Sequence, residues 1–232
     1  MNTLMKKKNE SSEQLNIQLF LLCMLAALLC RRLGKISSLR IICGMLRTMI
    51  YVGVYIGWGI SIYKRVIQKS VRNVLIFIAE LIIFWFVVRT TKYFFTMDNQ
   101  IARYLWYSYY IPMLFIPVAV LQAAFFLGKS EEYRLPKWLK GVYIPTAVLV
   151  LLVLSNDLHQ LVFSFPVGSA WSDSHYTYGW GYYVVLVWEV VCALTAFVLM
   201  IYKCRHSQKK KYLPLLGIGA AVLYAVLFIS GV

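Results

Sequence analysis

Seven long apolar runs alternate with short polar segments along the chain. Each run has roughly 15 to 25 residues, the length at which a helix crosses a hydrocarbon core of about 30 Å. None of the runs alternates apolar and polar positions with period two, so helices are the expected way to pair the backbone in lipid. The sequence therefore predicts an all-α, polytopic integral membrane helical bundle of about seven transmembrane helices, over Leu15–Cys30, Ile41–Tyr63, Asn73–Val88, Tyr104–Leu127, Val142–Ser155, Tyr182–Tyr202 and Tyr212–Val232.

The first run is short and follows Lys6-Lys7-Lys8, which makes it similar to the core of a signal peptide. A cleaved signal peptide ends in a small-residue pattern such as Ala-x-Ala, whereas "CRRLGK" follows this run. We therefore predict an uncleaved extra N-terminal helix over 15–30. Residues 1–14 are then a basic tail, and residues 15–232 form one transmembrane domain.

Composition supports a membrane protein, because 61% of the residues are hydrophobic and only 14% are charged. Soluble domains carry about a quarter charged residues. The net charge of +15 would suggest nucleic acid as a partner in a soluble protein, but here the Lys and Arg residues lie in short loops between apolar runs. We therefore expect the lipid bilayer and no nucleic acid as partner. The five cysteines form no Cys-x-x-Cys pair, so neither a zinc site nor a redox motif is indicated.

The distribution of Lys and Arg predicts the orientation of the bundle. The N-terminal tail and the loops 64–72, 129–140 and 203–211 carry sixteen basic residues, against seven on the opposite side, although the loop 31–40 with four of them argues the other way. The N-terminus is thus expected in the cytoplasm and Val232 outside. A further helix would be needed after Val232 before any cytoplasmic output domain.

The longest loop, 156–181, begins with the polar stretch Asn156-Asp157-Leu158-His159 and continues with many aromatic residues. Asp157 and His159, together with Asp173 and His175, do not have the spacing of a metal site, and we expect no metal. We expect Asn156 and Asp157 to make helix-capping and loop hydrogen bonds. Signatures of metalloproteases, serine hydrolases and P-loop proteins are absent, so neither catalysis nor a cofactor is expected.

Charged residues inside predicted spans are costly in lipid and indicate either structural pairing or function. Arg47, Glu80 and Glu189 are the clear cases. An Arg47–Glu80 ion pair is the leading interpretation, while a polar ligand pocket, a switching contact or a path for transport stays open. Tyrosines and a tryptophan crowd the segment 104–110, where packing or a ligand pocket roofed by the 156–181 loop would explain them. Pro112 and Pro117 are expected to bend the predicted helix Tyr104–Leu127, which contains them.

Four stretches carry a family resemblance: "RYLWYSYYIPMLFIP", "RLPKWLK", "IPTAVLVLLVLSNDLHQLVFSFP" and "YTYGWGYYVV". They are similar to the N-terminal seven-transmembrane sensor region of bacterial (Firmicutes-type) histidine kinases, over about 60–232. The resemblance implies a membrane input domain of a two-component system, in the bacterial plasma membrane, that passes a signal to a cytoplasmic kinase output. The chain contains neither the phosphorylated histidine helix nor the ATP-lid boxes of such an output.

We therefore predict a membrane-embedded signal-sensing domain, receptor-like and without catalysis of its own. An unknown small molecule or membrane signal is the expected partner, and a homodimer is left open. The candidate sensing residues are Asn156, Asp157, His159, Tyr178 and Tyr107. The alternatives are a small transporter or permease-like protein that uses Arg47, Glu80 and Glu189, and a purely structural membrane protein.

Overall fold

The computed structural model describes residues 2–34, 36, 39–94, 99–130, 132–166 and 175–205. Its elements are mostly helices: α1 (Asn2–Leu33), α2 (Arg40–Arg65), α3 (Lys69–Phe94), α4 (Asn99–Tyr107), α5 (Tyr110–Phe126), α6 (Lys137–Gly141), α7 (Tyr143–Leu154), α8 (Asn156–His159) and α9 (Trp180–Cys204). Two short strands, β1 (Phe163–Ser164) and β2 (Thr177–Tyr178), pair antiparallel between α8 and α9, with Phe163 opposite Tyr178.

Five segments of the described part are helical, long and apolar enough to cross a membrane: Arg40–Arg65, Lys69–Tyr93, Gln100–Phe126, Lys137–Leu154 and Trp180–Cys204. They correspond to the second to sixth predicted runs and confirm the all-α membrane bundle. The first predicted run lies inside α1, which is helical; that this helix crosses the membrane stays a prediction. The seventh run, Tyr212–Val232, lies outside the described residues.

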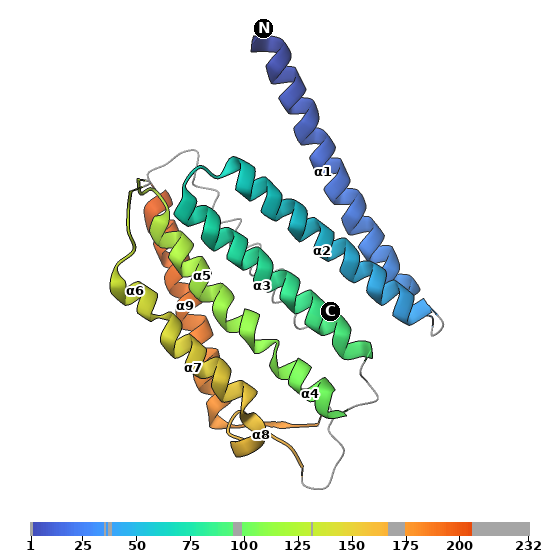
Figure 1. Ribbon diagram of the computed structural model, residues 1–232, viewed down its shortest axis with the longest axis vertical. Coiled ribbons are helices and arrows are strands. Elements are labelled where there is room, and N and C mark those ends of the chain that lie inside the picture. The colour runs from blue at the N-terminus through green and yellow to red at the C-terminus, as the bar shows by residue number, and fades with distance from the viewer. Residues whose placement is uncertain are drawn as a thin grey trace.

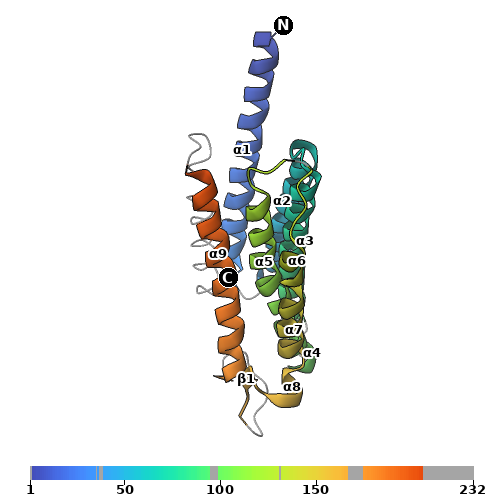
Figure 2. The same cartoon turned by 90° about the vertical axis from the view of Figure 1, so that its left-hand side faces the viewer.

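Helix α5 is the centre of the bundle. It packs against α3, α7 and α9, while α2 packs on the outer side of α3 and α1 on α2. Figure 1 shows this row of helices, with α1 reaching beyond the others at its N-terminus, and Figure 2 shows α9 as a second layer on one side of α5. Burial follows this arrangement, because Leu114, Val118 and Ala119 of α5 have no exposed surface at all.

A break separates α4 from α5 at Ser108 and Tyr109, four and three residues before Pro112. Proline has no N–H to donate to the carbonyl group four residues earlier, and its ring collides with that carbonyl. The chain instead makes shorter-range bonds at this point, such as Ile111 N–H to Ser108 O at 3.2 Å. Pro112 thus interrupts the predicted helix, whereas α5 continues through Pro117.

The two ends of the bundle differ in composition. One end holds α4, α8, both strands and the start of α9, and we call it the site end (Figure 1). The other end holds the α2–α3 loop, the end of α5, the beginning of the segment that leads to α6, and the end of α9, and we call it the basic end. The predicted basic loops 64–72 and 203–211 lie there as far as they are described, and the loop 129–140 runs from there down to α6 (Figure 1).

Candidate functional site

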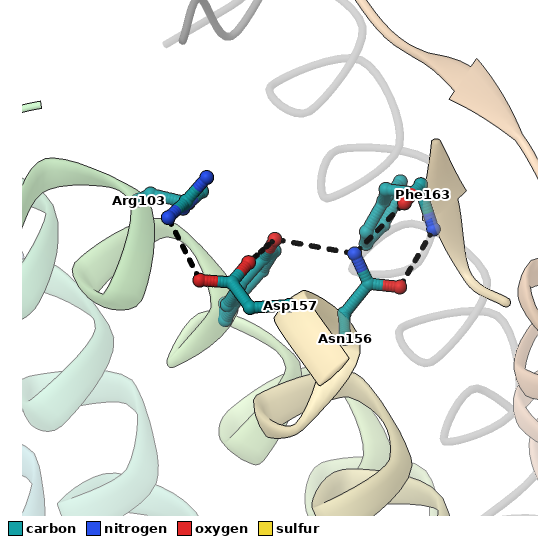
Figure 3. A network of polar contacts seen from close by, with 5 residues as sticks. Arg103, Asn156, Asp157 and Phe163 are labelled. Atoms are coloured by element: carbon teal, nitrogen blue, oxygen red, sulfur yellow. Dashed lines mark hydrogen bonds and ion pairs between the residues drawn. The ribbon is translucent and has the colours of Figure 1, made fainter. Parts of the chain in front are cut away.

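Asp157 stands at the centre of a polar network at the site end. Its Oδ2 forms an ion pair with the guanidinium of Arg103 at 2.8 Å, and its Oδ1 accepts a hydrogen bond of 2.7 Å from the hydroxyl group of Tyr107. Arg103 and Tyr107 are four residues apart and therefore share one face of α4. Figure 3 shows Arg103 reaching Asp157 from the α4 side. The ion pair links α4 to α8.

Asn156 connects this network to the strand that follows. Its Oδ1 accepts hydrogen bonds from the backbone N–H groups of Val162 and Phe163, both at 3.0 Å. Its Nδ2 donates to the carbonyl oxygen of Phe163 at 2.8 Å and to the hydroxyl oxygen of Tyr107 at 3.2 Å. The side chain has no exposed surface, and all four of its hydrogen-bonding positions are used. The predicted loop hydrogen bonds of Asn156 are confirmed.

We call the side chains of Arg103, Asp157, Tyr107 and Asn156, with the backbone of Phe163, the Asp157 network (Figure 3). Each member contacts the next, so the network runs without interruption from α4 through α8 to β1. Its inner part is buried, because neither Tyr107 nor Asn156 has exposed surface. The ion pair at its outer part is accessible, with 26% of the Arg103 side chain and 18% of the Asp157 side chain exposed.

His159 lies at the other side of α8 and does not join the network. Its Nδ1 accepts the backbone N–H of Leu161 at 3.0 Å, which leaves the hydrogen of a neutral ring on Nε2. Nε2 is 3.1 Å from the carbonyl oxygen of Leu152 and donates to it. His159 therefore fastens the turn after α8 to the end of α7. Gln160, in that turn, has the left-handed φ of 49°.

Tyr178 belongs to a cluster of aromatic rings around Phe163. The side chain of Phe163 is completely buried and fills the middle of this cluster. Its ring centroid lies between 4.6 and 6.2 Å from those of Trp106, Tyr107, Tyr110, Tyr176, Tyr178 and Tyr182. Trp106, Tyr107 and Tyr110, three of the aromatic side chains that suggested a ligand pocket, thus help to enclose a residue of the chain itself.

The segment before α9 reaches this cluster because two glycines allow a close approach. Gly179 and Gly181 donate backbone hydrogen bonds of 2.9 Å to the carbonyl oxygens of Val162 and Leu161. A Cβ atom at Gly179 would stand 2.1 Å from the Leu161 oxygen. The "YGWGYY" stretch therefore needs glycine at this position, for a steric reason.

The charged residues predicted inside spans do not come together. The hydroxyl groups of Thr48 and Thr90 are hydrogen-bonded, which places Arg47 beside the end of α3. Glu80 lies about three helical turns, or ~15 Å, farther along α3, and on its exposed face. The expected Arg47–Glu80 ion pair is therefore wrong for geometric reasons. Among the described residues, no hydrogen bond or ion pair joins any two of Arg47, Glu80 and Glu189.

Sequence reasoning found Asn156, Asp157 and Tyr107 but missed two partners. Arg103 was counted only as a flanking charge, although its spacing of four from Tyr107 places both on one helical face. Phe163 had no distinguishing signal, because it is one of several apolar residues in "QLVFSFP". Tyr178 contacts the network through Phe163. The role of these residues in sensing stays a prediction.

The family model for the N-terminal seven-transmembrane region of histidine kinases matches residues 41–231. The matched range includes every described transmembrane segment except part of the first turn of α2, and it includes the whole Asp157 network. Among curated proteins and among solved structures, none matches the chain significantly.

Proposed function

Because the chain belongs to the family of the N-terminal seven-transmembrane region of histidine kinases, we propose that it receives a signal at the Asp157 network and passes it to the basic end of the bundle. In this proposal it acts as a sensor rather than as a catalyst. A change at one end of the bundle alters an output at the other by shifting the balance between two helix arrangements.

The observation that carries this proposal is the Arg103–Asp157 ion pair. It is partly exposed to solvent, and Asp157 is also hydrogen-bonded to buried Tyr107. A ligand that competes with Arg103 for the Asp157 carboxylate also competes with the Tyr107 hydroxyl, which donates to the same group. Tyr107 packs on Phe163, with ring centroids 6.2 Å apart and planes inclined by 9°. Phe163 in turn contacts Tyr182 of α9 and Tyr110 of α5. A disturbance of the ion pair therefore has a short packed route to α5 and α9, both of which extend to the basic end.

We further propose that the site end faces the outside of the bacterial plasma membrane and that the N-terminus is cytoplasmic. The gathering of Lys and Arg at the opposite end supports this orientation, because cytoplasmic loops are enriched in both. Leu158 is suited to test it, since its side chain is 88% exposed beside Asp157. In a cysteine-free background, Leu158→Cys should react with a membrane-impermeant maleimide in intact cells and Lys64→Cys only after lysis. The reverse labelling would contradict the orientation.

The signalling proposal is tested in a chimera in which residues 1–232 precede a last membrane helix and the kinase output of a family member. Asp157→Asn and Arg103→Gln each remove the ion pair while keeping similar side-chain volumes. We expect each to change autophosphorylation in membrane vesicles about threefold or more, in the same direction. Leu158→Ala, in the same turn but exposed, is the matched control and should leave it unchanged.

Equal phosphorylation in wild type, Asp157→Asn and Arg103→Gln, at equal membrane levels, would overturn the proposed role of the network. A change in Leu158→Ala of the same size would overturn it as well, because any disturbance of α8 would then be sufficient. Opposite effects of the two ion-pair variants would argue against a shared contact and for two independent surface charges.

A further inference from the structure

The basic end brings together cations from three separate parts of the chain. Gln68 in the α2–α3 loop donates from Nε2 to the carbonyl oxygen of Ser130 at 3.0 Å. Lys203, near the end of α9, donates from Nζ to the carbonyl oxygens of Ala124 and Phe125 at 3.1 and 2.6 Å. These contacts gather a cationic surface at this end, made by exposed Lys64, Arg65, Lys69, Lys129, Arg134 and Arg205 with partly buried Arg72 and Lys203. Exposed Lys137 and Lys140 lie on α6, which follows in the chain.

The described residues provide little negative charge to balance this surface. Glu132 is the one carboxylate described there, and it is exposed. In the described ranges, no ion pair joins Lys64, Lys69 or Lys129 to a carboxylate. Lys129 also lies close enough to Lys203 for their charges to repel. An anion placed at this surface would relieve that repulsion.

Aromatic rings lie directly beside these cations. The guanidinium of Arg72 is 4.9 Å from the centroid of the Tyr63 ring, that of Arg205 is 4.3 Å from Tyr202, and Nζ of Lys129 is 5.2 Å from Tyr133. Trp138, between Lys137 and Lys140 on α6, is 62% exposed. Aromatic rings of this kind suit the boundary between hydrocarbon and headgroups. The anion that fits is therefore one held at the membrane surface.

We propose that the basic end is a binding surface for the phosphodiester headgroups of anionic phospholipids. Exposed Lys and Arg near a membrane surface attract such lipids by about 1 kcal/mol each, which corresponds to about fivefold in affinity per charge. The binding also ties the α2–α3 loop, the end of α5 and the end of α9 to one leaflet. It does not depend on the sensing proposal, since it involves the opposite end of the bundle.

Purified protein comprising residues 1–232, in neutral detergent micelles, is titrated with phosphatidylglycerol or with phosphatidylcholine, and the lipids that remain bound are counted by native mass spectrometry. We expect binding of phosphatidylglycerol to exceed that of phosphatidylcholine about tenfold or more and to weaken as salt is added. The triple variant Lys64→Gln, Lys69→Gln, Lys129→Gln should lose about tenfold or more of the phosphatidylglycerol affinity. The triple variant Arg31→Gln, Arg32→Gln, Arg40→Gln removes three exposed charges at the other end and should bind as the wild type does.

Equal binding of both lipids, or equal losses in both triple variants, would overturn the proposal. Inorganic phosphate that competes at millimolar concentration would also overturn it, because the surface would then bind a free anion. Single Lys129→Gln covers the case in which the triple variant does not fold, and it should weaken phosphatidylglycerol binding about fivefold. Unchanged affinity in this variant, with a native circular dichroism spectrum, would contradict the proposal directly.

Discussion

Gly179 lies directly against the carbonyl group of Leu161, so that a Cβ atom at residue 179 would stand 2.1 Å from the oxygen and 2.7 Å from the carbonyl carbon. The N–H of the same glycine donates to the carbonyl of Val162 at 2.9 Å. This backbone-to-backbone approach keeps β2 beside β1 and sets the position at which α9 begins. The entry of α9 into the bundle therefore depends on the absence of one side chain.

Replacing Gly179 by alanine should destabilise the bundle strongly. Real Cβ atoms do not approach a backbone oxygen to 2.1 Å, so the β1–β2 pair has to separate and α9 has to shift. We expect a loss of about 3 kcal/mol or more, in the range of the severest single substitutions. Thermal unfolding in detergent, followed by circular dichroism, measures it.

Gly53→Ala is the matched control for this substitution. Gly53 lies in α2 with nothing within 4 Å of a Cβ atom placed on it. Alanine favours helix over glycine by about 1 kcal/mol, so this variant should be as stable as the wild type or slightly more so. Equal stability of Gly179→Ala and Gly53→Ala would show that the close approach of Gly179 to Leu161 does not contribute to the stability of the bundle.

Asn156→Ala should remove the support of the loop after α8. The substitution leaves three buried backbone groups without their hydrogen-bond partner: the N–H groups of Val162 and Phe163 and the carbonyl of Phe163. Each unsatisfied buried group costs about 1–3 kcal/mol, so the variant should lose about 3 kcal/mol or more. Ser164→Ala, which removes only an exposed bond of 3.4 Å to Gln160, should change stability by less than about 0.5 kcal/mol.

The long helices could be predicted from the sequence, whereas the contacts of the site could be predicted only in part. Apolar runs predicted α2, α3, α5 and α9 because lipid imposes both length and composition on a spanning helix. The proline after the Tyr-rich segment indicated a bend, although not that α4 would separate from α5. Arg103 joins Asp157 across a gap in sequence that no local pattern bridges, since it depends on how α4 and α8 meet. The expected Arg47–Glu80 ion pair was wrong for the same reason, because the register of α2 against α3 decides the distance between these two side chains.

The Arg103–Asp157 ion pair should show a measurable coupling in a double-mutant cycle. Arg103→Gln, Asp157→Asn and the double variant are compared with wild type in thermal unfolding. Because both side chains are partly exposed, we expect a coupling of about 1 kcal/mol, and less at high salt. Arg103→Gln combined with Leu158→Ala should be additive. A coupling of zero at low salt would mean that the pair makes no net contribution to stability.

Thr146→Val tests the polar contact between α7 and α9. The indole N–H of Trp188 donates to the hydroxyl of Thr146 at 3.1 Å, and this hydroxyl donates to the carbonyl of Val142 at 2.8 Å. Thr146 has no exposed surface, so valine keeps the shape but leaves the indole N–H without its partner. Interhelical bonds in membranes contribute about 0.6 to 2 kcal/mol, and the variant should lose that amount.

Thr195→Val is the control for this measurement, because among the described residues its hydroxyl bonds only to the carbonyl of Val191 within α9. Trp188 also lines an apolar groove between α7 and α9, next to Val148 and Val187. In Thr146→Val, these apolar neighbours offer no hydrogen-bond acceptor to replace the lost hydroxyl. A loss in Thr146→Val that exceeds the loss in Thr195→Val assigns the difference to the contact between helices. If both variants are equally stable, α7 and α9 are positioned by their packing on α5 alone, and the indole N–H finds another acceptor.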